Sequence, residues 1–380
     1  MLIGAAEDAG KTPVFGDSKA QFELAAAAGM NAIRVTAQWR PGMAAPDGGV
    51  VSLFQTTSQA ATLTGVRIIV SVYPKANHEV PLDAASRSEF ASFAAGLAAA
   101  VPELNDFIVG NEPNLNYFWL PQYDLGGTSA SPRAYVELLA ATYDALKTVR
   151  PAINVIGGSV SPAGTDKPDG LRPTHSPGKF ILGMGEAYRA LGRSAPLMDT
   201  FAFHPYGRSS QSPPSARHPN STRISLGDYA KLVSFLARAF NGTPQRGADL
   251  PVLYDEYGVQ SRIPRAKRSL YTQIASPSAA DAVDEQTQAA YYRQALEIAY
   301  CQPTVVGFLF FHTVDERDLR RWQSGLFYPD LTPKSSFGPV RDSILLARAG
   351  RLASCSSADA PTGSPAAEFP SARERDAYVG

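Results

Sequence analysis

The chain has 380 residues, and its 35 basic and 35 acidic side chains give a formal net charge of zero. This balance offers no overall attraction to nucleic acid or an anionic membrane, so we expect neither as a partner and predict that the protein acts on a neutral molecule. No apolar run approaches the ~20 residues of a membrane span. The first strand signal comes too early for a signal peptide, so we expect a chain from which any leader is absent.

Short apolar runs alternate with longer amphipathic stretches eight times, which is typical of a parallel sheet whose strands are each followed by a helix. Eight such units predict an α/β fold, a single (β/α)8 TIM barrel over residues 1–353. The expected strands are residues 2–6, 32–36, 67–72, 106–110, 154–158, 200–204, 252–256 and 306–311. Helical periodicity covers residues 18–29, 84–100, 132–149, 179–191, 226–240, 285–300 and 340–351, and is weakest between 55 and 64.

The segments after the fourth, sixth and seventh predicted strands are long, and long loops at this end of a barrel form its active face. Residues 207–225 and 258–284 are irregular, and each is either a wall of a substrate cleft or a surface insertion. Residues 354–380 have no periodicity and predict an irregular or partly disordered C-terminal tail. The two cysteines, Cys301 and Cys355, form either a disulfide or two free buried thiols, because sequence does not give their separation.

Two glutamates stand at the ends of two predicted strands, in Asn111-Glu112-Pro113 and in Asp255-Glu256. Because the carboxyl ends of all barrel strands meet at one mouth, we expect Glu112 and Glu256 to face each other. A carboxylate on each side of a glycosidic bond is sufficient for hydrolysis with retention when the carboxyl groups are ~5–5.5 Å apart. The alternatives are a simple turn at Glu112 and a solvated strand end at Glu256.

A third apolar run, residues 200–203, ends in His204-Pro205-Tyr206. With Asn-Glu-Pro after strand four, His-x-Tyr after strand six and Glu after strand seven, the chain resembles clan A of the glycoside hydrolases, and the cellulase-like family five and its relatives look nearest. Arg34 matches the arginine that many members carry after strand two. The resemblance covers roughly the first 350 residues and implies a retaining (β/α)8 glycosidase that binds a carbohydrate and needs no cofactor or metal.

The resemblance also implies roles for individual residues. Glu256 is expected to be the nucleophile and Glu112 the acid/base, protonated at the start of the reaction. Hydrogen bonds from Tyr206 and Arg34 are expected to keep Glu256 ionised. Asn111 is expected to bind the sugar 2-hydroxyl, and His204 to bridge the groups around the acid/base.

All three tryptophans, Trp39, Trp119 and Trp322, come shortly after predicted strands. Aromatic planes stack on the C–H faces of sugars, so we expect all three on the active face and predict that at least one forms a sugar platform, with loop packing as the alternative. Many clan members place a tryptophan at the end of strand eight, where this chain has Phe311 and His312. We therefore expect His312 with Phe311, or a returning Trp322, beneath the sugar that is cleaved.

The sequence allows two other functions. Residues 5–12 nearly match a phosphate-binding loop, but Ala5 stands at the first glycine position and Pro13 follows in place of an immediate helix, so a nucleotide-binding ATPase is disfavoured. A catalytically silent carbohydrate-binding barrel remains an alternative.

Because polysaccharides lie outside cells, we expect a secreted or extracytoplasmic protein. The sugar, the linkage, endo or exo action and the oligomeric state are left open.

Overall fold

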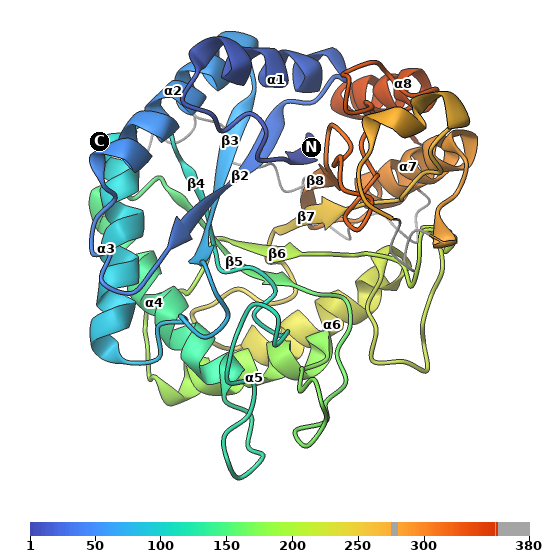
Figure 1. Ribbon diagram of the computed structural model, residues 1–380. Helices are drawn as coiled ribbons and strands as arrows, with labels where there is room; N and C mark the ends of the chain where they lie inside the picture. The colour runs from blue at the N-terminus through green and yellow to red at the C-terminus, as the bar shows by residue number, and fades with distance from the viewer. Residues whose placement is uncertain (275–279, 354, 356–380) are drawn as a thin grey trace.

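The computed structural model describes residues 1–274, 280–353 and 355. Parallel strands close into a barrel in which neighbours in the chain pair with each other and β8 pairs with β1. Figure 1 shows the strands at the centre with the helices in a ring around them. The strands are β1 (Leu2–Ala6), β2 (Ala32–Trp39), β3 (Arg67–Pro74), β4 (Asp106–Val109), β5 (Asn154–Val160), β6 (Thr200–Phe203), β7 (Val252–Tyr257) and β8 (Val305–Phe311).

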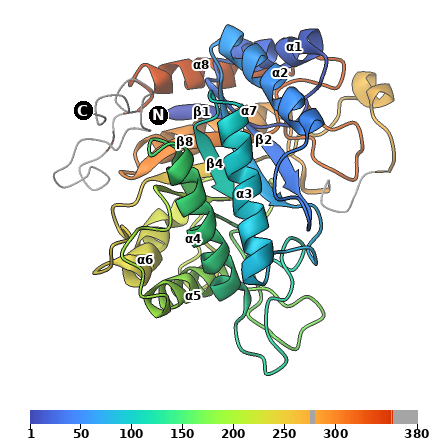
Figure 2. The same cartoon turned by 90° about the vertical axis from the view of Figure 1, so that its left-hand side faces the viewer.

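The helices cover the outside of this barrel, as Figure 2 shows for α3, α4 and α5. They are α1 (Phe15–Ala27), α2 (Gly48–Thr64), α3 (Ala84–Ala100), α4 (Ser131–Val149), α5 (Pro177–Ala190), α6 (Tyr229–Phe240), α7 (Glu285–Tyr300) and α8 (Phe337–Arg348), with 3-10 helices η1 (Leu226–Asp228) and η2 (Arg265–Leu270). The predicted single (β/α)8 barrel is therefore confirmed. Among the described residues, none of the helices is long and apolar enough to cross a membrane.

The least clearly indicated helix, between residues 55 and 64, is the C-terminal part of α2. This helix begins at Gly48 because the Asp47 side chain accepts a hydrogen bond from Val50 N, which satisfies a free N–H of the first turn. It ends at Gly65, whose φ of 70° suits a glycine. The predicted C-terminal tail lies outside the described residues, apart from Cys355.

The interior of the barrel is filled by one apolar side chain from each strand. Because successive side chains of a strand point to opposite faces, this layer sets the register of every strand. The layer consists of Leu2, Ala32, Ile69, Ile108, Ile156, Ala202, Leu253 and Leu309, all buried. A larger apolar cluster fills the space between the barrel and its helices.

Polar residues follow this apolar layer at the carboxyl ends of the strands. Arg34, Ser71, His204 and Asp255 each come two residues after a member of the layer, so they also point inward, one level closer to the mouth. All four are buried. A polar layer therefore separates the apolar interior from the open end of the barrel.

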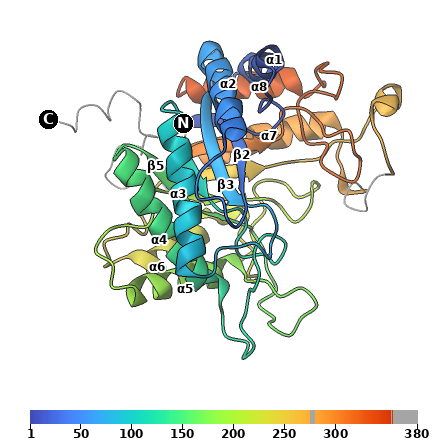
Figure 3. The ribbon, with the colours of Figure 1, turned by 60° about the vertical axis from the view of Figure 1, so that its left-hand side comes forward.

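The loops at the two ends of the barrel differ in length. Most helix-to-strand connections are short, whereas the segments that follow β4, β5, β6, β7 and β8 are long. Figure 3 shows the segments after β4 and β5 extending below the helices, and η2 of the segment after β7 projecting to the right. The functional site is therefore expected at the carboxyl ends of the strands.

A disulfide joins Cys301 and Cys355, with Cα atoms 5.3 Å apart. It ties the end of α7 to a residue beyond α8, across 54 residues of sequence. The structure thus decides between the two states that the sequence left open for these cysteines.

Candidate active site

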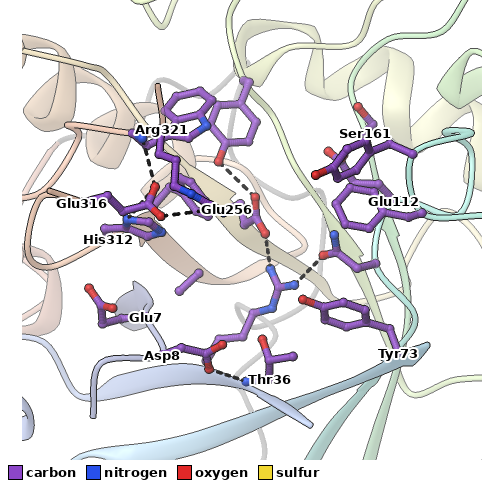
Figure 4. Close-up of a pocket in the computed structure, with 18 of the residues that line it drawn as sticks. Glu7, Asp8, Thr36, Tyr73, Glu112, Ser161, Glu256, His312, Glu316 and Arg321 are labelled. Carbon is purple, nitrogen blue, oxygen red and sulfur yellow. Dashed lines mark hydrogen bonds and ion pairs between the residues drawn. The ribbon is translucent and has the colours of Figure 1, made fainter. Parts of the chain in front are cut away.

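A cavity of about 1060 Å³ opens at the carboxyl ends of the strands. Figure 4 shows residues of its lining, with Glu256 near the centre, Glu112 and Tyr73 on one side, and His312 and Glu316 on the other. Arg34, Asn111, Tyr206 and Trp322 also line this cavity. The closed barrel has therefore brought together residues that are more than 200 positions apart in sequence, such as Arg34 and Glu256.

Glu112 is placed by an irregular backbone at the end of β4. Gly110 has φ of 88° and Glu112 has φ of 39°, a region that residues with a side chain rarely adopt. A hydrogen bond from Glu112 N to Ser159 O, 2.8 Å long, holds this conformation against the end of β5. Such a backbone costs about 1–3 kcal/mol. The surrounding contacts thus keep the Glu112 carboxylate at the mouth of the barrel.

Both carboxylate oxygens of Glu256 accept hydrogen bonds. Arg34 Nη1 donates to Oε1 at 2.6 Å, and the Tyr206 hydroxyl donates to Oε2 at 3.0 Å. These are the two donors that were expected for Glu256. Burial, followed by the charge of Glu256, raises the pKa of Tyr206 well above its usual value, so its hydroxyl stays protonated and remains a donor.

Arg34 is also bound on its other side. It is buried, and its Nη2 donates to Asn111 Oδ1 at 2.5 Å. Burial works against the charged guanidinium, but the negative charges of Glu256 and Asp255 outweigh it and raise the pKa of Arg34 above its usual value. Because the Asn111 oxygen is taken up by Arg34, its amide NH2 is the group left to donate to a ligand in the cavity.

His204 lies beneath the cavity and contacts both glutamates. Its Nδ1 is 2.9 Å from Glu112 Oε1 and 3.6 Å from Glu256 Oε2. These two carboxylate oxygens are therefore no more than about 6.5 Å apart. The two carboxyl groups thus lie close enough to act on the two sides of one glycosidic bond.

The imidazole of His204 is enclosed by acidic groups. Its Nε2 is 3.0 Å from Ser159 Oγ and 3.3 Å from Asp255 Oδ2. Burial alone would lower the pKa of His204, but the charges of Glu256 and Asp255 outweigh it and raise this pKa to about 10. The ring is therefore a cation at neutral pH, and both nitrogens donate hydrogen bonds.

The charges of this cluster balance when Glu112 carries a proton. The cations Arg34 and His204 then face the anions Asp255 and Glu256. Burial would raise the pKa of Asp255, but His204 and Arg34 outweigh this effect and hold it below its usual value. A buried cluster without net charge avoids the large free-energy cost of an isolated buried ion.

Two of the predicted sugar platforms are not part of the cavity. Trp39 is fully buried, packs against Phe90 and donates from Nε1 to Met43 O. Trp119 is also buried and packs against Tyr135. The expectation that Trp39 and Trp119 stack on substrate is wrong, because both rings belong to the large apolar cluster and are covered by other side chains. Trp39 is the last residue of β2, and only Trp119 is a case of loop packing.

Trp322 does reach the cavity. Its ring lies 5.3 Å from that of Tyr206, centre to centre, and 5.4 Å from that of Phe311. His312 and Phe311 also line the cavity, with ring centres 4.0 Å apart. All three side chains considered for the end of strand eight therefore line the cavity, and which of them lies beneath the sugar stays a prediction. His312 has φ of 79°, and its Nδ1 is buried without a hydrogen-bond partner in the described structure.

The loop between β8 and α8 folds back to place Trp322. Trp322 N donates to Glu316 Oε2, and Glu316 N donates to Trp322 O. Below this turn, the buried Lys334 ammonium donates to Asp315 Oδ1 and Ser261 Oγ, each at 2.8 Å, and to the carbonyl of Gln323. These contacts join three parts of the chain directly beneath Trp322.

The long loops contribute unequally to the walls. From residues 207–225, Gly207 and Arg223 line the cavity, whereas none of the described residues of 258–284 does. At the N-terminus, Lys11 pairs with Asp8 and donates to Thr36 O, and α1 begins only at Phe15. A phosphate-binding loop needs a free lysine and an immediate helix, so this segment does not fit an ATPase.

Sequence reasoning missed several residues of the site. Asp255 and Ser159 contact Nε2 of His204, and Tyr73 lines the cavity together with Arg34. Alternation along β3 and β7 carries a signal for Tyr73 and Asp255, since both share the inward face with a core residue. Ser159 had no such signal, because the register between β5 and β6 shifts at this point.

No family model matches the chain, and no curated protein matches its sequence. Solved structures with a similar fold include a family 39 glycoside hydrolase from Bacteroides cellulosilyticus, with 16% identity and a TM-score of 0.60, over 91% of this chain and 62% of that chain. The chain thus spans less than two thirds of that enzyme.

Two further structures are similar. A GH5_18 protein from Bifidobacterium longum, in complex with Manβ1-4GlcNAc, has 13% identity and a TM-score of 0.62, over 92% of this chain and 79% of that chain. A GH39 β-xylosidase from Caulobacter crescentus has 18% identity and a TM-score of 0.55, over 90% and 70%. The resemblance to barrel glycoside hydrolases expected from sequence is confirmed at the level of the fold.

Proposed function

We propose that the protein is a retaining glycosidase that hydrolyses β-linked O-glycosidic bonds of a glycoside or polysaccharide. The observation that carries this proposal is the convergence of Glu112 and Glu256 on one nitrogen of His204 at the mouth of the cavity. Two of their oxygens lie within about 6.5 Å of each other, which supports a retaining arrangement, because an inverting enzyme needs room for a water molecule between one carboxylate and the substrate. One similar structure holds Manβ1-4GlcNAc and another is named a β-xylosidase, which supports a β-linked substrate.

In the first step, Glu256 attacks the anomeric carbon and forms a covalent glycosyl ester, while the bond from this carbon to the leaving oxygen breaks. Glu112 gives its proton to that oxygen. The Glu112 Oε1 atom already accepts from His204, so Oε2 is the oxygen that carries the proton. Hydrogen bonds from Arg34 and Tyr206 hold the Glu256 carboxylate in place before the attack.

In the second step, a water molecule attacks the same carbon and Glu256 leaves. Glu112, now a carboxylate, accepts a proton from the water. The positive charge of His204 stabilises the site before and after the first step, because Glu112 becomes an anion when Glu256 loses its negative charge in the ester. His204 thus stabilises one negative charge throughout, first mainly on Glu256 and then on Glu112. Asn111 is placed to donate to a hydroxyl of the sugar.

The roles of the two glutamates are tested with 2,4-dinitrophenyl β-glycosides of xylose, glucose, mannose and N-acetylglucosamine, with and without sodium azide. Wild type should release the β-anomer first, as seen by NMR. Glu112→Ala should form the covalent ester and, with azide, yield a β-glycosyl azide. Glu256→Ala should lose turnover and, with azide, yield at most the α-glycosyl azide, because azide then attacks directly.

A surface variant, Glu186→Ala on α5, serves as the control and should behave as wild type. If Glu112→Ala gave the α-glycosyl azide and Glu256→Ala gave the β-glycosyl azide, the roles of the two glutamates would be the reverse of those proposed. First release of the α-anomer by wild type would refute retention. Binding of these sugars without any turnover would favour the silent carbohydrate-binding barrel instead.

We also propose that the protein works in an oxidising, extracytoplasmic compartment. The Cys301–Cys355 disulfide supports this location, since such bonds persist mainly outside the reducing cytosol. Fractionation of the native host, with detection by antibody, tests the proposal; recovery of the protein with cytosolic markers alone would contradict it.

A further inference from the structure

We infer that the cavity binds a second sugar of the same substrate, on a platform formed by Tyr117 and Phe118. This inference rests on the proposed glycosidase function. Both residues line the cavity. Tyr117 is 76% exposed, although Trp119, two residues later in the same turn, is buried in the core. An exposed aromatic ring beside an active-site cavity is a binding surface for the C–H face of a sugar.

The platform lies on a rigid turn that begins at Glu112. Leu115 N donates to Glu112 O, and Phe118 N and Trp119 N both donate to Leu115 O. The buried Asn114 side chain binds the backbone of the next loop at Ser161 and His175. The turn is therefore held from below, and Tyr117 is exposed without being mobile on a loose loop.

Contacts with the end of β3 fix the turn from a second direction. Asn77 Nδ2 donates to Asn116 O at 2.8 Å, and Leu120 N donates to Asn77 O. The Phe118 ring packs edge-on against Tyr73 and against Tyr117, with centres 6.3 and 4.9 Å apart. Binding to such a fixed surface loses little conformational entropy, which favours the ligand.

The platform is separate from the place of the sugar that reacts. Trp322 and Phe311 pack on Tyr206, which binds Glu256, so this aromatic wall belongs to the reacting ring. Figure 4 shows Tyr73, against which Phe118 packs, on the opposite side of Glu256 from His312 and Glu316. A ring on Tyr117 is therefore a different sugar from the one beside Trp322.

The size of the cavity agrees with two or more rings. Its volume of about 1060 Å³ lies at the upper end of the ~300–1,000 Å³ range of small-molecule sites. The lining between the two aromatic walls is polar, with Arg34, Asn111 and the two glutamates. The substrate is thus an oligosaccharide or polysaccharide, with one sugar at the carboxylates and another on the Tyr117 platform.

The test compares one-ring and longer substrates. The β-glycosyl fluorides of xylose, glucose and mannose have a leaving group without a ring, so they occupy only the reacting position. The longer substrates are the corresponding β-1,4-linked di-, tri- and tetrasaccharides. For each enzyme, the kcat/KM of the tetrasaccharide is divided by that of the fluoride of the same sugar, which cancels any general loss of activity.

Tyr117→Ala should lower this ratio about two- to twelvefold, the effect of one lost stacking contact of ~0.5–1.5 kcal/mol. Tyr117→Phe keeps the ring and should restore the ratio. Leu125→Ala, at an exposed leucine that does not line the cavity, is the control and should match wild type.

The outcomes separate the two proposals. If wild type hydrolyses a fluoride and Tyr117→Ala leaves the ratio unchanged, the platform is refuted and the glycosidase stands. If Tyr117→Phe lowers the ratio as much as Tyr117→Ala, stacking is refuted as its basis. If wild type hydrolyses none of the fluorides or oligosaccharides, the proposed function fails and the inference fails with it.

Discussion

The protonated state of His204 makes a quantitative prediction about stability. In the folded protein the pKa of His204 is raised from 6.5 to about 10, because Glu256, Asp255 and Glu112 surround the ring. A raised pKa stabilises the fold fully below the unfolded value, and this contribution is lost as pH rises from 6.5 through about 10. At ~1.4 kcal/mol for each pKa unit, the full loss is about 5 kcal/mol, of which about 4 kcal/mol has occurred by pH ~10, where the folded group is half protonated.

The assay is urea unfolding of wild type and His204→Asn at several pH values between about 6 and about 10. Asparagine keeps a hydrogen-bonding side chain of similar size but does not titrate. Wild type should lose about 4 kcal/mol more unfolding free energy over this range than the variant does. The exposed His78 provides the matched control, and His78→Asn should follow wild type.

Equal pH dependence in wild type and His204→Asn would refute the reasoning, since other titrating groups are common to both proteins. A direct check is the NMR titration of the imidazole nitrogens, in which His204 should stay protonated at neutral pH. A neutral ring at that pH would also remove the cation that we assign to the second step of hydrolysis.

Three further predictions concern other parts of the site and the fold. Lys334→Met leaves the buried Asp315 without its cationic partner and should lower the unfolding free energy by about 3–5 kcal/mol in urea; a loss below about 1 kcal/mol would contradict the buried pair. Tyr206→Phe removes one donor to Glu256 and should lower kcat/KM about 10- to 100-fold without loss of folding by circular dichroism; unchanged kcat/KM would show that this donor is dispensable. Cys301→Ala opens a loop of 54 residues and should lower stability by about 2–4 kcal/mol, and reducing agent should then have no added effect on the variant, whereas it destabilises wild type.

The order and type of the barrel elements followed from the sequence because each strand is a short apolar run and each helix has its own periodicity. Such local patterns also placed Glu112 and Glu256 at strand ends, and the closed barrel brings strand ends together. The contacts of Arg34 and Tyr206 with Glu256 were expected from the resemblance to known enzymes. The resemblance did not indicate Asp255 or its contact with His204.

The loops were predicted less well, and the tryptophans illustrate the reason. Trp39, Trp119 and Trp322 all follow predicted strands, yet among them only Trp322 lines the cavity. Trp39 is the last residue of β2, on the strand face opposite to Arg34, whereas the other two lie in loops. A loop has no periodicity from which the direction of a side chain can be read. Its path depends on contacts with distant segments, such as those that Lys334 makes with Asp315 and the carbonyl next to Trp322.

The barrel, the strand ends and the pair of glutamates can be read from the amino-acid order alone, because hydrophobic periodicity is a local property and eight repeated units indicate a closed barrel. The folded chain was needed to show that His204 lies between the two carboxylates, that Trp39 and Trp119 are core residues and that Tyr117 is exposed beside the cavity. These features depend on irregular backbone and on contacts between residues far apart in the chain, which arise only when the barrel has closed.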